Sequence, residues 1–129
     1  MKTYTIAGNP KKLIYAQSNR RKMWNEQKEL KRITAIDLGV QQNGPPIDTG
    51  PLELEVWFYL DFPPKMTKSK KLQWEGTNHS YKPDLFRMVE FIRAVGQGII
   101  FSHCCLITNL KCHKRYSHDL RTEFTLRKI

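Results

Sequence analysis

Two acidic side chains in residues 82–92 are the first candidates for chemistry in this chain. Asp84 stands where a helix is expected to begin, so its carboxylate can cap that helix or offer oxygen ligands to a hard cation such as Mg²⁺. Glu90 comes six residues later. At 3.6 residues per turn it points about 120° away from Asp84. Glu90 is therefore a poor second ligand, and a surface pairing with Arg87 or Arg93 is favoured.

Sulfur and imidazole ligands offer a second kind of chemistry, the binding of zinc. The candidates are Cys104, Cys105, Cys112 and His113. They contain no Cys-x-x-Cys pair, and Cys105 and Cys112 would point to opposite faces of one strand. The spacing therefore argues against a structural zinc site.

The cysteine count and the amino-terminal residues bear on the compartment. Three cysteines, two of them adjacent, do not form a secreted-type disulfide pattern, so reduced thiols are expected. Residues 2–5 lack the apolar run of a signal peptide, and no apolar stretch of membrane-spanning length follows. The sequence predicts a cytoplasmic protein with no membrane partner.

The net charge favours a phosphate-rich partner. Lys and Arg number 22 against 12 Asp and Glu, which gives a formal charge of +10. The excess is uneven, since residues 48–63 contain four acids and no base, whereas residues 64–82 contain five lysines and one acid. A loop at residues 64–82 is therefore expected to present a phosphate-binding rim, although a solvated surface with no ligand stays open.

The amino-terminal half predicts one strand and one long helix. Residues 4–6 are a short β-prone run that ends at Gly8-Asn9-Pro10. Residues from about 18 to 38 predict a helix capped by Ser18 or Asn19. Its expected apolar stripe is Met23, Trp24, Leu30, Ile33, Ile36 and Leu38. The proline-rich residues 41–51 predict a connector, because proline lacks the amide donor that a helix needs.

Residues 52–61 alternate between apolar and polar side chains, which predicts a strand with one buried face. Pro63 and Pro64 end it, and a long lysine-rich loop to residue 82 is expected to have a functional role. The next helix begins after Asp84 and ends at Gly96 or Gly98. Its apolar face is predicted to be Leu85, Met88, Val89, Ile92 and Val95.

Two more strands are predicted near residues 105–113 and 122–126, joined by a polar turn at residues 115–119 into a hairpin. No internal repeat or low-complexity tract is present. The expected fold is a single α/β (α+β) domain over residues 1–129, with a small mixed sheet of about four strands packed by two main helices.

The order of these elements, and the spacing of residues 82–117, resemble the RusA family of Holliday-junction resolvases, small dimeric nucleases common in phage and prophage. That family has a Pro-Asp-Leu-Asp-Asn-Leu-x-Lys helix start, a glycine near the helix end, an Asp-Asp pair, an apolar position, a lysine and a Tyr-Ser. The matching residues here are Pro83, Asp84, Leu85, Gly98, Ile107, Lys114, Arg115, Tyr116 and Ser117. Residues 5–10 and 52–61 resemble the opening strand and the strand before the proline, so the resemblance covers nearly the whole chain.

The resemblance is weakest at the polar positions. Phe86 stands where the family has its second aspartate, Arg87 where it has asparagine, and Glu90 where it has the helix lysine. His103 and Cys104 occupy the Asp-Asp pair. The catalytic positions implied by the resemblance are therefore Asp84, His103 and Cys104, with Asp84 as the remaining metal ligand.

The resemblance implies a homodimeric endodeoxyribonuclease that needs Mg²⁺ and acts on branched DNA, above all four-way junctions, in DNA recombination and repair. Hydrolysis of a phosphodiester by such an enzyme depends on carboxylates that hold the metal. A phenyl ring at position 86 supplies no ligand, so we expect weakened or lost catalysis and no cofactor in that case. The residues expected to bind DNA are Lys68, Lys70, Lys71, Lys82, Lys114 and Arg115.

Two alternatives stay open. An active, metal-dependent junction nuclease could use a rearranged site in which Asp119, Glu75 or another acid joins Asp84. His103 and Cys104 are softer ligands, so such a site could also hold a transition metal. Alternatively, a noncatalytic structural or partner-binding protein could keep only the dimeric fold and bind an acidic protein or RNA.

Overall fold

A computed structural model describes residues 2–14 and 20–129, with the side chains of residues 20–26 left outside the described part. These residues form four strands, three α-helices and one 3₁₀ turn. In chain order they are β1 (Lys2–Ala7), α1 (Arg20–Gln42), β2 (Leu52–Leu60), α2 (Lys68–Trp74), α3 (Leu85–Gly96), η1 (Cys104–Leu106), β3 (Ile107–Tyr116) and β4 (Arg121–Lys128).

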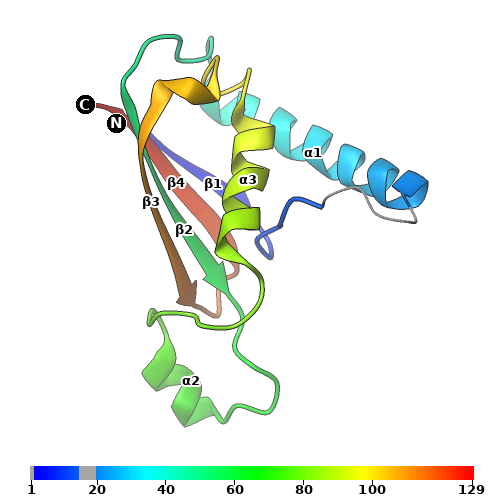
Figure 1. Cartoon of the computed structure of the whole chain (residues 1–129). Coiled ribbons are helices and arrows are strands. Elements are labelled where there is room, and N and C mark those ends of the chain that lie inside the picture. Colours follow the sequence, from blue (N-terminus) through cyan, green and yellow to red (C-terminus); the bar gives the residue numbers. More distant parts are fainter. Residues whose placement is uncertain (1, 15–19) are drawn as a thin grey trace.

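The strands form one mixed sheet in the order β1-β4-β2-β3, and α1 and α3 lie across one face of it (Figure 1). β2 pairs parallel with β3 and antiparallel with β4, which also pairs antiparallel with β1. The predicted mixed α+β fold with a four-stranded sheet is therefore confirmed. The other face of the sheet has no helix over it in the described part of the chain.

The predicted hairpin is wrong, because β2 lies between β3 and β4. Neighbouring strands are about 4.8 Å apart, so the connection must cross about 10 Å. Residues 117–120 are long enough for this, since four extended residues span up to about 13 Å. The amide of Ser117 donates to the carbonyl of Leu60 at 2.8 Å, which holds the connection against the end of β2.

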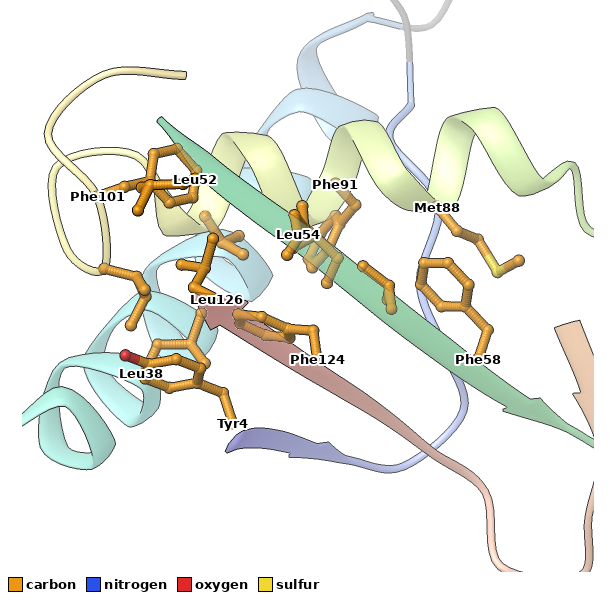
Figure 2. Close-up of a cluster of buried hydrophobic side chains, with 14 of the residues drawn as sticks. Tyr4, Leu38, Leu52, Leu54, Phe58, Met88, Phe91, Phe101, Phe124 and Leu126 are labelled. Carbon is orange, nitrogen blue, oxygen red and sulfur yellow. The ribbon is translucent and has the colours of Figure 1, made fainter. Parts of the chain in front are cut away.

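The core lies between the sheet and the two long helices. The apolar side chains of β2 alternate as predicted, and all five that face the helices are at most 2% exposed. They are Leu52, Leu54, Val56, Phe58 and Leu60. Figure 2 shows Leu54 and Phe58 of this strand next to Phe91 and Met88 of α3, with Phe124 of β4 beside them. The two-residue period of the strand and the 3.6-residue period of the helix each place apolar side chains on one face, and these two faces pack together.

The α3 helix matches its prediction closely. Asp84 is its N-cap, and one of its carboxylate oxygens accepts from the amide of Phe86 at 2.9 Å. Met88, Ile92 and Val95 are buried, whereas Leu85 and Val89 are partly buried. The helix ends at Gly96, and Gly98 follows with a φ of +85° that glycine adopts without strain.

The α1 helix differs from its prediction in length and in its buried face. It runs to Gln42, four residues past the expected end, while Ser18 and Asn19 lie outside the described residues and the side chains of Met23 and Trp24 are not described. Ile33 and Ile36 are exposed. Gln27, Thr34 and Leu38 are buried and Leu30 is partly buried, so the inward positions follow offsets of three and four.

Two polar residues join that stripe because their hydrogen bonds are satisfied. The side-chain oxygen of Gln27 accepts from the amide of Ile14 at 2.9 Å. The hydroxyl of Thr34 donates to the carbonyl of Leu30 at 2.8 Å. A pattern that scores apolar residues alone selects the neighbouring stripe.

The lysine-rich stretch predicted as a loop contains the short helix α2. Thr67 caps it by accepting from the amide of Lys70 at 3.4 Å. None of its residues is buried, so no apolar periodicity marks it in the sequence. Its lysines therefore lie on a helix rather than on an irregular loop.

A pair of glycine substitutions tests this packing. A Cβ at Gly96 would lie 2.9 Å from a ring carbon of Phe101, which is fully buried. We expect Gly96→Ala to lower the free energy of unfolding by about 1–3 kcal/mol because the ring must move. In Gly39→Ala the new methyl group would meet only a methyl of Ile99 at 3.7 Å.

The second substitution is the matched control. A helical alanine costs less conformational entropy than glycine, so Gly39→Ala should raise the free energy of unfolding by about 0.5–1 kcal/mol. Urea denaturation of both variants measures the difference. Equal stability of Gly96→Ala and the wild type would show that Phe101 repacks without cost.

Candidate nucleic-acid interface

The carboxyl ends of β2 and β3 gather basic side chains from three separate segments. Residues 76–79, which follow α2, run beside the end of β3: the amide of Gly76 donates to the carbonyl of Tyr116 at 2.8 Å, and that of His79 to the carbonyl of Lys114 at 3.0 Å. These bonds fix α2 below the sheet, where Figure 1 shows it. We call this region the basic end and define it by Lys68, Lys70, Lys71, Lys82, Lys114 and Arg115.

An aromatic cluster anchors α2 to the sheet. The buried ring of Tyr116 lies 5.5 Å from that of Phe62, 5.3 Å from Trp74 and 4.5 Å from His79, measured between ring centroids. Contacts of this kind stabilise by roughly 0.5–1.5 kcal/mol each beyond the area they bury. A helix too short to be stable alone is thus held by tertiary packing.

Glu75, at the end of α2, serves the same anchor. Its carboxylate accepts from the hydroxyl of Ser117 at 3.1 Å and from the amide of His118 at 3.2 Å. The hydroxyl of Ser117 in turn accepts from the amide of Asp119 at 3.1 Å. Glu75, one of the acids considered as a partner of Asp84, is therefore bound to the β3–β4 connection.

Asp84 lies at the basic end, close to Lys114. The Lys114 ammonium donates to the carbonyl of Tyr81. Burial lowers the pKa of Lys114, and the nearby Asp84 carboxylate partly opposes this shift. Because one oxygen of Asp84 caps α3 and Lys114 faces it, the acid already has structural partners. Its predicted role as a cap is confirmed, whereas its predicted role in catalysis is not addressed by these contacts.

His103 and Cys104 lie at the opposite end of α3. The helix has 12 residues, so its ends are about 18 Å apart. Asp84 is beside Lys114, which pairs with Phe58, whereas His103 and Cys104 come just before Ile107, which pairs with Leu52. His103 is exposed and Cys104 is partly buried. One copy of the chain therefore does not bring the three predicted catalytic positions together.

The donor set at Asp84 does not fit Mg²⁺. Mg²⁺ prefers near-octahedral oxygen ligands, but the groups near Asp84 are the ammonium of Lys114 and the backbone amide of Phe86, and neither supplies an oxygen ligand. No group of three or more His, Cys, Asp or Glu side chains that could hold a metal ion occurs among the described residues. The predicted metal role of Asp84 thus lacks the companion ligands it would need within that part of one chain.

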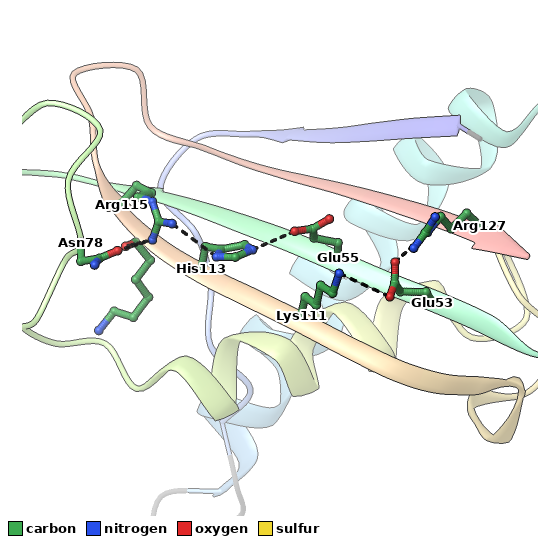
Figure 3. A network of polar contacts seen from close by, with 8 residues as sticks. Glu53, Glu55, Asn78, Lys111, His113, Arg115 and Arg127 are labelled. Atoms are coloured by element: carbon green, nitrogen blue, oxygen red, sulfur yellow. Dashed lines mark hydrogen bonds and ion pairs between the residues drawn. The ribbon is translucent and has the colours of Figure 1, made fainter. Parts of the chain in front are cut away.

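The open face of the sheet carries a network of paired charges (Figure 3). Glu53, only 5% exposed, accepts from Arg127 at 2.6 Å, with Lys111 at 3.7 Å. The Arg127 hydrogen bond lowers the pKa of Glu53 despite the opposing effect of burial. Glu55 lies 2.9 Å from His113, whose ring stacks on Trp57. On this face, bases and acids largely neutralise one another.

Arg115 connects the open face to the basic end. Its guanidinium donates to the side-chain oxygen of Asn78 and lies 3.4 Å from Nδ1 of His113. Lys114, one residue earlier, points to the helix side of the sheet because side chains alternate along a strand. The two residues therefore flank the strand end from its two faces.

Two basic residues near this end were missed by the sequence analysis. Lys11 and Lys12 line a surface pocket together with Lys82 and Pro83. The pocket joins the loop after β1 to the residues before α3, and it also contacts α1 through Leu30. The excess of bases in residues 1–47 indicated that this part of the chain could add to a basic surface. The fold was needed to show that Lys11 and Lys12 lie beside Lys82.

His79, whose ring packs against Tyr116, predicts that the free energy of unfolding depends on pH. Burial, aided by the charge of Lys114, lowers the pKa of His79 below its ordinary 6.5. The unfolded chain then binds more protons than the folded chain, so the free energy of unfolding should fall as the pH drops through 6.5 toward the lower folded pKa. Urea denaturation at about pH 7.5 and about pH 5.5 measures this effect.

His79→Phe is the control, because it keeps a ring against Tyr116 but cannot titrate. It should lose the hydrogen bond in which Nδ1 of His79 accepts from the amide of Tyr81, and show a smaller decrease on acidification. An unchanged pH dependence in this variant would assign the effect to other groups.

No protein-family model matches this chain, and no curated protein matches it either. Among the described residues, no helix has both the length and the apolar character needed to cross a bilayer.

Proposed function

We propose that this protein binds DNA through the basic end. The observation that carries the proposal is that six basic side chains from α2, the loop before α3 and β3 gather at one end of the sheet. Lys68, Lys70 and Lys82 are exposed, as phosphate contacts require. By contrast, Lys111, His113 and Arg127 on the open sheet face are paired with Glu53 or Glu55.

The preferred substrate in this proposal is branched DNA, above all a four-way junction. The resemblance of residues 82–117 to the RusA family supports this choice, and the role that it implies is in DNA recombination and repair. A homodimer is part of the proposal, since two basic ends can contact two arms of a junction. The exposed apolar side chains of Ile33, Ile36 and Val40 on α1 are compatible with a contact between two copies of the chain.

We further propose that catalysis is weakened or lost. Phe86 offers no metal ligand, and His103 and Cys104 stand far from Asp84 within one chain. If the protein does cleave DNA, the expected cofactor is Mg²⁺ held by Asp84 and additional carboxylates. If it does not cleave DNA, no cofactor is needed. A protein that binds an acidic partner or RNA on the same fold is the competing proposal.

A comparison of DNA substrates tests binding. We expect a fluorescently labelled four-way junction to bind more tightly than a linear duplex of the same arm sequence. The affinity should fall by about 0.9 log units per log unit of salt for each phosphate contacted. An interface made for a protein should be less sensitive to salt.

Equal, weak and salt-insensitive binding to both DNAs would contradict the proposal. Preferential binding to a structured RNA of matched length would favour the competing one. Cleavage is measured in the same samples with Mg²⁺ or Mn²⁺, and rapid symmetric nicking that Asp84→Asn abolishes would show that an active site exists.

A further inference from the structure

The exposed aromatic side chains of the described chain are concentrated at the basic end. Among the described Phe, Trp and Tyr side chains, the exposed ones are Trp74, Tyr81 and Phe86, at 39%, 66% and 76%. All three lie within residues 74–86, between and beside the lysines of α2 and Lys82. Single exposed apolar residues are common, but a group of this kind in one basic segment indicates a binding surface.

Two of these rings are displayed by a fixed backbone. The amide of Tyr81 donates to His79, and its carbonyl accepts from Lys114. Phe86 lies in the first turn of α3, and its amide donates to Asp84 at 2.9 Å. Trp74 is different, because its ring already packs against the ring of Tyr116. Tyr81 and Phe86 are therefore exposed to solvent, and neither ring contacts another aromatic ring among the described side chains.

The charges around the rings select the occupant. Lys82 and Lys114 lie next to them, so a second copy docking here by the same surface would bring like charges together. A nucleic acid is complementary to this surface, because its negative phosphates can pair with the lysines and its flat bases can stack on the rings. Stacking of a base on an aromatic ring requires a base that is unpaired, because paired bases are covered by their neighbours.

We propose that Tyr81 and Phe86 stack on unpaired DNA bases, and that the protein therefore binds a duplex with a single-stranded segment more tightly than a blunt duplex. The inference rests on the proposed binding of DNA at the basic end. It also gives position 86 a use: the resembling family has an acid there, whereas this chain presents a ring to the same phosphate-binding region.

Anisotropy titrations with two DNAs test the inference. One is a blunt duplex, and the other is the same duplex with a single-stranded overhang. The wild type should bind the overhang DNA more tightly. Tyr81→Ala combined with Phe86→Ala should weaken overhang binding about tenfold or more, and blunt-duplex binding much less.

The matched control removes exposed apolar side chains elsewhere. Leu110→Ala on β3 combined with Ile129→Ala after β4 deletes two surface groups that are each 51% exposed and should leave both affinities unchanged. Phe86→Trp, in a chain that keeps Tyr81, should retain overhang binding because the ring is kept. Fluorescence of a 2-aminopurine in the overhang reports stacking directly, and its change on binding should be lost in the double alanine variant.

The outcomes separate this inference from the proposed function. Salt-dependent binding by the wild type that the double alanine variant retains on both DNAs would overturn the stacking role and leave DNA binding intact. An equal loss on both DNAs would also overturn it. A double variant that changes the sedimentation of the protein would assign the rings to a contact between copies. If the wild type binds neither DNA, the proposed function fails and the inference fails with it.

Discussion

Replacing Lys68, Lys70 and Lys82 by alanine is expected to weaken binding to four-way junction DNA by roughly several hundred-fold at about 0.1 M salt. If each ammonium contacts one phosphate, the slope of log affinity against log salt falls by about 2.7, because each contact contributes about 0.9. The three side chains are exposed, so the fold should be little affected. Titrations at four or more salt concentrations give both the affinity and the slope.

The control removes three lysines away from the basic end. Lys2, Lys111 and Lys128 are exposed, and Lys2 and Lys128 line a pocket near Tyr4 and Leu52, at the opposite end of the sheet. Both sets lower the net charge of +10 by three, to +7. If both variants lose the same affinity, the attraction comes from net charge and not from the basic end.

Elements with a local period could be predicted from the sequence. The alternation of β2 and the three-and-four spacing of α3 were sufficient, because each element buries one face against the same core. Asp84 was predictable as a cap for a similar reason, since the cap acts on the amides that follow it. In these cases a residue and its partner are close in the sequence.

Pairing between distant segments was not predictable in this way. Strand character marks β3 and β4, but nothing local shows that β2 enters between them. The α2 helix was missed because its seven residues bury none of their side chains, and its stability comes from Trp74 and Glu75 contacting Tyr116 and Ser117. The buried face of α1 was predicted only in part: Leu30 and Leu38 were expected there, but Gln27 and Thr34 were missed because they satisfy their hydrogen bonds inside the protein.

The candidate site shows the same division. The lysines of residues 64–82 were identified from composition and Lys114 from the family resemblance, whereas the fold was needed to place Lys11 and Lys12 beside them. Matching of Asp84, His103 and Cys104 to a family frame gave their order along the chain. The match to the family did not show that the length of α3 separates Asp84 from His103 and Cys104.

Restoring the family's side chains is expected to create Mg²⁺-dependent cleavage of four-way junctions, with acids contributed by two copies of the chain. The restored variant carries Phe86→Asp, Glu90→Lys, His103→Asp and Cys104→Asp. Within one copy, positions 84 and 86 remain about 18 Å from positions 103 and 104, because α3 lies between them. A metal contributes several kcal/mol of transition-state stabilisation, so the rate should rise at least several hundred-fold over the wild type.

Division of the four substitutions between two chains tests this arrangement. One chain carries Phe86→Asp and Glu90→Lys, and the other carries His103→Asp and Cys104→Asp. Each chain alone should be inactive, and their mixture should cleave because one complete set of acids forms across the contact between copies. Adding Asp84→Asn to the first chain should abolish that activity. Cleavage by the fourfold variant without cleavage by the mixture would show that the acids meet within one chain, and that α3 must move from its position here to bring them together.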